Sequence, residues 1–430
     1  MRSPHETAAT ITTMSATDSD QTTAGGMPSE VDRAPTPRRR VVIVASWYPT
    51  RLSPVGGIFV QDQAVALAGA FDVAIIAPIE LSWRSPLRAI RRRKVRGTPL
   101  ANDPALTIRP LVVLLPWAGS LNERSYERAV AQSLRTLEES WGRPDLLNAH
   151  IVLPAGLAAV RISRRTGVPA VLTEHSGPFQ MHLGSRHSLA VVTEALDGAS
   201  RVIAVSSRLR DEIRDVRAVP VDIVGNVVAP GFFEHDVVQP SPHKTIRVLS
   251  VGYFVPEKRF DLLLEAVARA RDRMPQLEVV LVGEGKQRAS LRRLAARLGV
   301  SDLVRFSGFT TREGLRRWLE WTDALVSSSD HESFGLVVAE ALAVGRPVIT
   351  TASGGPQSFV NDRVGITVPR GDPHALADAL TRIPAFLESF DPHAARRAVE
   401  ARFGPAAFVE KMGSIYEEVI AAAAGGRSRV

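Results

Sequence analysis

Short runs of β-branched and apolar residues alternate with longer helical patterns along this chain, and the series occurs twice. In the first half the runs lie at residues 40–46, 71–78, 144–150, 169–175, 201–206 and 221–226. In the second half they lie at residues 245–252, 277–283, 303–308, 323–329, 346–351 and 364–369. Continuous apolar runs of this kind are typical of parallel strands that helices cover on both faces. The alternation predicts an α/β fold with two doubly wound, Rossmann-like domains.

The boundaries of these domains follow from changes in composition. Residues 1–38 are rich in Thr, Ser, Ala, Pro and Gly and lack the apolar core of a signal peptide, so we expect a disordered tail. The first domain is predicted over residues 39–228 and the second over residues 229–400, joined where Pro and Gly cluster near residues 227–245. The helical pattern of residues 401–424 predicts a terminal helix that packs back on the first domain.

The absence of cysteine excludes several kinds of bond and site. With no Cys in 430 residues, the chain can form neither a disulfide nor a thiolate metal site, and it has no Cys nucleophile. This composition suits a cytoplasmic location. No apolar run approaches the roughly 20 residues that a membrane-spanning helix needs. The Asp-x-Asp pattern of some metal-dependent enzymes occurs only at Asp18–Asp20, in the predicted tail, so we expect no metal ion.

The formal charge of +8 leaves nucleic acid, an anionic lipid surface and phosphate-bearing substrates open as partners. Basic residues are densest at residues 81–97, where they alternate with Trp83, Leu87 and Ile90. This pattern suits the headgroup region of an anionic membrane, and a plain solvated loop is the alternative. No zinc-finger spacing, stacking motif or helix-turn-helix accompanies the charge, which argues against nucleic acid. We expect peripheral contact with the inner face of the cell membrane.

Several chemically capable residues stand at or just after the carboxyl ends of predicted strands. They are Gly56, Gly57, His150, Glu174, His175, Lys258 and Glu332. Ligands of parallel α/β sheets bind at the carboxyl ends of the strands, and two facing sheets place the site in the cleft between them. Each of these residues alone could be solvated or structural, and a histidine could simply be packed in the core. Their joint placement predicts a ligand site in the cleft, with the imidazole of His175 facing it.

The segment "HESFGLVVAEAL" places Glu332 in the loop before a predicted helix and Glu340 about two turns later, on that helix. The backbone N–H groups of Phe334, Gly335 and Leu336 at the helix start would favour an anion. A carboxylate can accept hydrogen bonds from a vicinal diol, as the acidic residue of dinucleotide sites does. A ligand with both phosphates and sugars would use all of these groups. The alternative is that Glu332 caps the helix and Glu340 is a solvated charge.

Longer motifs lie in a fixed order along both halves. The second half contains "VGYFVPEKRFDLLLEAV", "LVGEGKQRASL", "VRFSGF", "SSSDHESFGLVVAEALAVGRPVITTASGGPQSFV", "GITVPRGDPHALADAL" and "FVEKMGSIYEEVI". The first half contains "ASWYPTRLSPVGGIFVQDQAVAL", "LLNAHIVLPAGLAAV" and "LTEHSGPF". Over residues 39–422 the chain resembles the nucleotide-sugar-dependent glycosyltransferases of family 4, and its first half resembles the subgroup that builds teichuronic acids and other bacterial polysaccharides. Glu332 and Glu340 match the Glu-x7-Glu signature of that family.

This resemblance implies a GT-B fold, with two Rossmann-like domains facing each other across a cleft. It implies transfer with retention of configuration from a nucleoside diphosphate sugar, with no other cofactor, to a glycan or lipid-linked sugar. It further implies that Lys258 contacts the donor diphosphate, Glu340 the ribose, and both Glu332 and His175 the transferred sugar. Positive charge and helix N–H groups can stabilise the leaving diphosphate without a metal.

These inferences combine into three groups of candidate site residues. The catalytic group is His175, Lys258 and Glu332. The donor-binding group shares Lys258 and Glu332 with the catalytic group and adds Gly57, Arg259, Phe334, Gly335, Leu336 and Glu340. The acceptor side is assigned to Gly56, His150 and Glu174.

Two departures from the family pattern keep other functions open. Tyr253 stands where an Arg is common, and Arg259 stands where a Gly is usual, so one phosphate-binding cation is displaced. A catalytically silent, membrane-bound partner of a polysaccharide assembly complex is therefore one alternative, and a nucleoside-diphosphate-sugar epimerase on the same fold is another. An oxidoreductase is disfavoured, because Gly283-x-Gly285 is followed by Arg288 where a dinucleotide fingerprint has its third glycine.

Overall fold

The computed structural model describes residues 37–51, 53–82, 103, 106–237 and 245–427. The predicted tail over residues 1–38 lies outside the described residues except at its end, and so does the basic stretch over residues 81–97 except at its start. No helix in the described ranges is long and apolar enough to cross a membrane.

The first domain is built on a seven-stranded parallel sheet with the strand order β4-β2-β1-β6-β7-β8-β9. Its strands are β1 (Arg40–Ala45), β2 (Asp72–Ile76), β4 (Leu106–Ile108), β6 (Leu146–His150), β7 (Ala170–Glu174), β8 (Arg201–Ala204) and β9 (Val221–Ile223). Strands β3 (Ile79–Ser82) and β5 (Leu111–Leu114) form a separate parallel pair. Strands β3, β4 and β5, of three or four residues each, were not predicted from the sequence.

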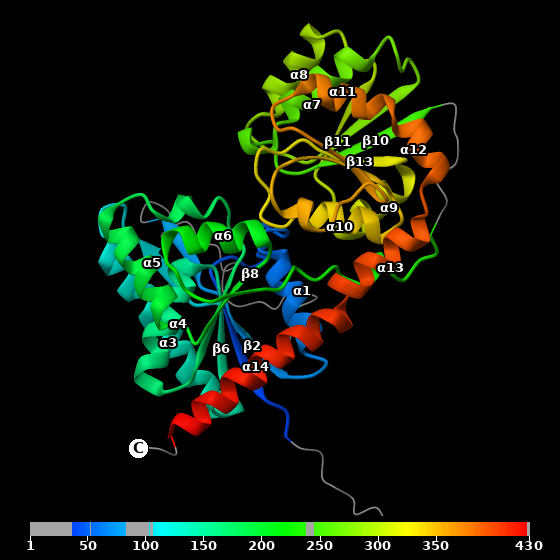
Figure 1. The fold of residues 1–430 in the computed structure, drawn as a ribbon. Coiled ribbons are helices and arrows are strands. Elements are labelled where there is room, and N and C mark those ends of the chain that lie inside the picture. Colours follow the sequence, from blue (N-terminus) through cyan, green and yellow to red (C-terminus); the bar gives the residue numbers. More distant parts are fainter. Residues whose placement is uncertain (1–36, 52, 83–102, 104–105, 238–244, 428–430) are drawn as a thin grey trace, which may run out of the picture. The chain divides into compact units, whose positions relative to one another are not determined.

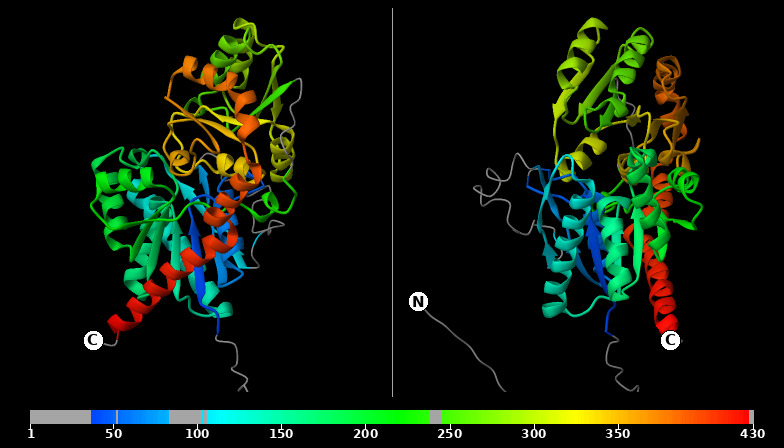
Figure 2. Two further views of the ribbon diagram at one scale, coloured as in Figure 1. Left: turned by 45° about the vertical axis from the view of Figure 1, so that its right-hand side comes forward. Right: turned by 90° about the vertical axis from the view of Figure 1, so that its left-hand side faces the viewer.

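Helices cover both faces of this sheet, because alternate strand residues point in opposite directions. The helices are α1 (Ile58–Leu67), α3 (Gly119–Trp141), α4 (Leu157–Thr166), α5 (Arg186–Gly198) and α6 (Ser207–Val216), together with the terminal α14 (Pro405–Arg427). Val42 and Val44 of β1 share a core with α3, α4 and α5, whereas Val41 and Ile43 share one with α1 and α14. Figure 1 shows these two groups of helices beside the strands of the first domain. In both views of Figure 2, α14 runs alongside the sheet of the first domain.

The second domain is built on a six-stranded parallel sheet with the strand order β12-β11-β10-β13-β14-β15. Its strands are β10 (Ile246–Val251), β11 (Leu277–Val282), β12 (Val304–Gly308), β13 (Ala324–Ser327), β14 (Val348–Thr351) and β15 (Gly365–Val368). Helices α7, α8 and α11 pack on one face, and α9 and α10 pack on the other. The helix bounds are α7 (Phe260–Ala270), α8 (Arg288–Arg297), α9 (Arg312–Trp321), α10 (Leu336–Ala343), α11 (Pro373–Thr381), α12 (Ile383–Ser389) and α13 (Pro392–Phe403).

Both sheets contain a point where the strand order reverses, between β1 and β6 in the first domain and between β10 and β13 in the second. In open α/β sheets the loops that leave the strands at such a point diverge and form a crevice for ligands. Two Rossmann-like parallel sheets confirm the predicted fold class. The candidate residues after β1, β6, β10 and β13 lie at these two points.

Candidate active site

Lys258 and Glu332 lie side by side at the carboxyl ends of β10 and β13. Lys258 ends the one-turn helix Pro256–Lys258, and its Nζ donates a hydrogen bond to Oε1 of Glu332 at 2.6 Å. Ser329 Oγ donates to the same carboxylate oxygen at 2.7 Å. The Lys258 side chain keeps 29% of its surface exposed, so other N–H donors of its ammonium group can reach an anion. The fold thus brings together two of the three predicted catalytic residues, from positions 74 residues apart.

The start of α10 has no side-chain cap among the described residues. Gly335 adopts a left-handed conformation, with φ of 86°, immediately before the helix, and has no side chain with which to cap it. The alternative that Glu332 caps this helix is therefore wrong. Glu332 instead pairs its backbone with the next loop, since its N–H donates to Ser353 and its carbonyl accepts from Gly355 at 2.7 Å. This pairing directs the Glu332 side chain toward Lys258.

Phe334 and Leu336 were also predicted to contact the donor. Unlike Lys258 and Glu332, they can do so only through backbone groups. The Phe334 ring is 3% exposed and packs against Phe359 and Phe403, so only its backbone remains for a ligand. Leu336 is the first residue of α10, where its N–H is one of the unpaired donors of the first turn. The helix start can therefore bind an anion through backbone groups alone.

Arg259 is turned toward carboxylates of its own domain. Its backbone is left-handed, with φ of 48°, and its guanidinium forms ion pairs with Asp261 and Asp330 at 3.2 Å each. Hydrogen bonding to Asp261, followed by the charge of both carboxylates, raises the pKa of Arg259 above its ordinary value. Two negative charges therefore already match this cation, so it is a weak substitute for the phosphate-binding Arg missing at position 253. Its contact with the donor stays a prediction.

Glu340 lies in surroundings quite unlike those of Glu332. It is 3% exposed within α10, so the alternative that it is a solvated charge is wrong. Burial raises the pKa of Glu340 to about 8, although the Arg312 guanidinium opposes the rise. Arg312, the first residue of α9, forms an ion pair with Asp62 of α1 in the first domain. Glu340 thus belongs to a buried charge cluster with Arg312 and Asp62.

Arg312 and Asp62 were not among the residues predicted from the sequence. A signal for Asp62 exists, because Gln61, Asp62 and Gln63 are three successive polar residues that are all buried within α1. Three polar neighbours at the start of an otherwise apolar helix cannot all face water, so at least one needs a buried partner. Nothing local marks Arg312, because its partner stands 250 residues earlier in the chain.

In the first domain, His150 and His175 form a stacked, hydrogen-bonded pair at the ends of β6 and β7. Nδ1 of His150 lies 2.8 Å from Nε2 of His175, and the ring planes are 15° apart. Phe59 of α1 also packs against His175, with the two ring centroids 4.5 Å apart. Burial lowers the pKa of His175 to about 3 and that of His150 well below its ordinary value. Both imidazoles are therefore neutral at pH 7.

Glu174 orders the loop that follows β7. Its carboxylate accepts hydrogen bonds from the backbone N–H groups of Val152, His175 and Ser176 at 2.7 to 2.9 Å, and from the Ser176 hydroxyl. These bonds take up most of its accepting capacity and hold His175 in place. A contact between Glu174 and a sugar acceptor stays a prediction.

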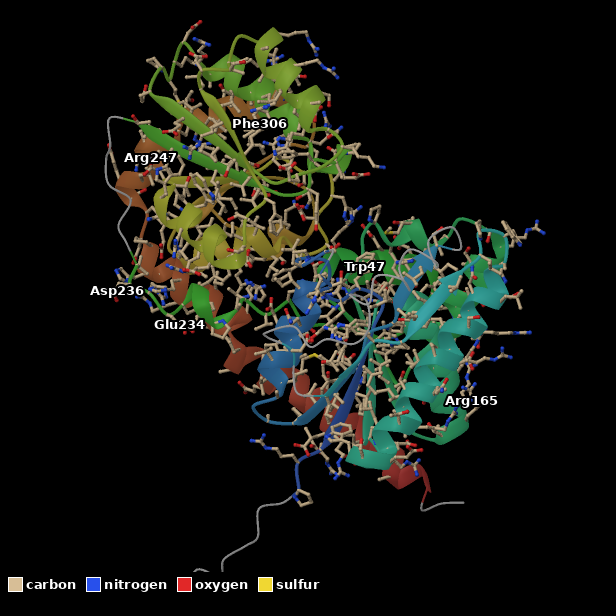
Figure 3. All side chains as sticks on the ribbon, turned by 180° about the vertical axis from the view of Figure 1, so that it is seen from behind. Trp47, Arg165, Glu234, Asp236, Arg247 and Phe306 are labelled. Atoms are coloured by element: carbon tan, nitrogen blue, oxygen red, sulfur yellow. The ribbon has the colours of Figure 1, made fainter. Side chains whose placement is uncertain are left out.

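The glycines after β1 are needed for a close approach of backbone. Gly57 has φ of 74° and directly precedes α1, and a Cβ atom there would lie 2.3 Å from the carbonyl oxygen of Trp47. A Cβ atom on Gly56 would lie 2.5 Å from Ser53 Oγ. Trp47 itself is 45% exposed at the end of β1 (Figure 3). The first turn of α1 is therefore held against the loop that leaves β1.

A second polar contact joins the loops of the two domains. Nε2 of His331 lies 3.2 Å from Oε1 of Glu212 in α6, and a Cβ atom on Gly177 would touch the His331 ring. His331 directly precedes Glu332, and Gly177 follows His175 by two residues. The two predicted catalytic loops, after β7 and after β13, are therefore in contact.

Comparison with known proteins accounts for most of this chain. Residues 56–231 match the model of Glycosyltransferase Family 4, and residues 232–385 match that of Glycosyl transferases group 1. A D-inositol 3-phosphate glycosyltransferase of Thermobispora bispora is 30% identical over 311 residues, which cover 65% of this chain and 72% of that protein. The chain belongs to the group 1, family 4 glycosyltransferases. This confirms the family predicted from the ordered motifs.

Other relatives of this glycosyltransferase differ in what their names describe. A D-inositol 3-phosphate glycosyltransferase of Frankia alni is 35% identical over 56% of this chain, and the match spans 65% of that relative, slightly less than two thirds of its length. TuaC of Bacillus subtilis, named for teichuronic acid biosynthesis, is 27% identical over 80% of this chain and 88% of its own length.

Solved structures share the fold of the glycosyltransferase. Sucrose-phosphate synthase from Thermosynechococcus elongatus has a TM-score of 0.70 at 23% identity, covering 90% of this chain and all of that one. Anabaena HepE in complex with UDP has a TM-score of 0.66 at 19% identity, covering 88% of this chain and all of that one.

Proposed function

We propose that this glycosyltransferase moves a sugar from a nucleoside diphosphate sugar to a glycan or lipid-linked sugar in bacterial cell-surface glycan synthesis. The transfer retains the anomeric configuration and uses no metal ion. The observation that carries the proposal is the Lys258–Glu332 pair beside the uncapped start of α10. A cation and a set of free N–H groups suit a diphosphate, and a neighbouring carboxylate suits sugar hydroxyls.

The chemistry of the leaving group explains this arrangement. When the bond to the sugar breaks, negative charge develops on the diphosphate oxygens. Lys258 and the N–H groups at the start of α10 are positioned beforehand to stabilise that charge. Glu332 holds Lys258 through its hydrogen bond, and its carboxylate can also accept from a sugar hydroxyl. HepE, a neighbour in fold, binds UDP, which supports a nucleoside diphosphate as leaving group.

A screen of nucleoside diphosphate sugars tests the proposal. A donor that binds only the folded protein raises the unfolding midpoint with its concentration, so the screen identifies base and sugar together. Proton NMR of the product formed with that donor and an acceptor then gives the anomeric configuration. Conversion of the donor to its epimer without an acceptor would support the epimerase instead, and no shift with any donor would support the silent partner.

His175→Ala is expected to lower sugar transfer at least about tenfold, or roughly 1.4 kcal/mol of transition-state stabilisation. A neutral imidazole can hydrogen-bond a sugar hydroxyl without adding positive charge beside a cationic transition state. Initial rates per folded molecule measure the effect, and the donor-induced thermal shift should remain nearly intact. A variant that loses stability but transfers sugar at the normal rate would make His175 a packing residue only.

Contact of residues 81–97 with an anionic membrane stays a prediction. Binding to vesicles should require acidic lipids, weaken with added salt, and fall when Arg91, Arg92, Arg93 and Lys94 are made neutral. If the neutralised variant binds vesicles as well as the wild-type protein does, residues 81–97 are a plain surface loop with no role in membrane binding.

A further inference from the structure

A chain of buried polar side chains connects the terminal helix α14 to His175. Asn148 Nδ2 lies 2.6 Å from the Tyr416 hydroxyl of α14 and 3.2 Å from Nε2 of His150. His150 Nδ1 lies 2.8 Å from His175 Nε2, and Thr173 Oγ1 donates to Asn148 Oδ1 at 2.9 Å. None of these five residues is more than 6% exposed. Bulk water is therefore kept away from these side chains, and each hydrogen bond that they form to one another helps to satisfy a buried polar group.

The hydrogen bonds determine where the proton of each imidazole sits. The carboxamide oxygen of Asn148 accepts from Thr173, so its amino group is the side that faces His150. A ring nitrogen that accepts from an amide carries no proton, so neutral His150 is protonated on Nδ1 and donates to Nε2 of His175. Neutral His175 must then carry its own proton on Nδ1.

Nδ1 of His175 is a buried donor that lacks a partner. Among the described residues, none makes a hydrogen bond of normal geometry with this atom. The Asn226 side chain comes near enough to the ring only for a weak hydrogen bond, which opposes the fall in the pKa that burial causes. Native proteins pair nearly all buried polar groups, so an unpaired one requires an explanation. A bound ligand with a hydrogen-bond acceptor would satisfy it.

We propose that Asn148 is a positioning residue that sets the tautomer of His175, so that Nδ1–H donates a hydrogen bond to a hydroxyl oxygen of the bound sugar. The identity of the ligand rests on the proposed function, whereas the tautomer does not. In this arrangement Nδ1 of His175 cannot act as a base, because it already holds a proton. Its part is to orient the sugar.

Asn148→Asp provides the sharpest test, because it keeps the size of the side chain and replaces the donating amino group with an accepting oxygen. His150 should then carry its proton on Nε2 and accept at Nδ1 from Nε2–H of His175. Nδ1 of His175 is left with a bare lone pair. Long-range proton–nitrogen NMR spectra of the full chain, labelled with nitrogen-15 at histidine, distinguish these tautomers directly.

The expected result is that His175 is protonated on Nδ1 in the wild-type protein and on Nε2 in Asn148→Asp. Transfer by the variant should fall at least about tenfold in kcat, while a nucleoside diphosphate still raises its unfolding midpoint. Asn361→Asp is the matched control. It makes the same chemical change in an exposed turn of the second domain, where the side-chain oxygen is the group in use, so it should alter neither the spectra nor the rate.

Two results would overturn the proposal. One is a wild-type spectrum with the proton of His175 on Nε2, which needs no variant to fold. The other is an unchanged His175 tautomer in Asn148→Asp. If no nucleoside diphosphate sugar binds the wild-type protein, the proposed function fails, but the two spectra still decide whether Asn148 sets the tautomer.

Discussion

Lys258→Ala should lower the turnover of sugar transfer by about 30- to 1,000-fold at saturating donor, or about 2 to 4 kcal/mol by analogy with single oxyanion donors. The variant loses the cation that stabilises the departing diphosphate. It also leaves the Glu332 carboxylate, held 2.7 Å from Ser329 Oγ, without its positive partner beside that leaving group. Both changes raise the energy of the transition state more than that of the bound donor.

Lys258→Ala should change the free energy of unfolding very little. Lys258 is partly exposed, and ion pairs of this kind contribute little to the free energy of unfolding. Initial rates at saturating donor and thermal unfolding of the same preparations separate the two effects. Lys411→Ala, which removes an exposed lysine of α14, is the control and should transfer sugar normally. Normal turnover by Lys258→Ala would show that this lysine does not take part in catalysis.

Arg312→Met should destabilise the folded protein by about 3 kcal/mol or more at neutral pH, which is the usual cost of removing one partner from a buried ion pair. Arg312 is the counterion of Asp62, whose side chain is 8% exposed, and it opposes the rise in the pKa of Glu340. Methionine fills much of the same space but leaves both carboxyl groups without a cation. Urea unfolding gives the free energy directly.

The loss of folding stability in Arg312→Met should depend on pH. Burial raises the pKa of Glu340 from 4.5 to about 8 and that of Asp62 above 3.8, so each group holds its proton longer in the folded chain. For both groups the folded state binds more protons than the unfolded state, and stability falls as pH rises through that window. Without Arg312 both pKa values rise further, so the difference between variant and wild type should be larger at pH 8 than at pH 5.

The control for this experiment lies on the same helix. Arg317→Met removes a cation whose partner, Glu313, is exposed, so the free energy of unfolding should change by no more than about 0.5 kcal/mol at either pH. An equal loss for Arg312→Met at pH 5 and pH 8 would contradict the assignment of Glu340 and Asp62 to one charge cluster with Arg312.

Residue patterns alone could predict the order of the strands and helices along the chain. They could also predict that the site lies at the carboxyl-terminal edge of the parallel sheet. All six strands of the second sheet lie within predicted runs, because parallel strands buried on both faces are continuously apolar. The adjacency of Lys258 and Glu332 then follows from strand direction, since the carboxyl ends of neighbouring parallel strands meet at one edge. The uncapped start of α10 follows from Gly335, which has no side chain.

Other properties of the site depend on residues far apart in the chain. Periodicity and turn chemistry involve neighbours within a few positions, so they were enough to predict the two sheets, their parallel direction and the positions of Lys258 and Glu332. The burial of Glu340 beside Arg312, and the tautomer that His175 receives through His150 and Asn148, follow only from the folded chain. Burial and hydrogen-bond partners set the protonation of a side chain, and both come from segments that meet only when the chain has folded.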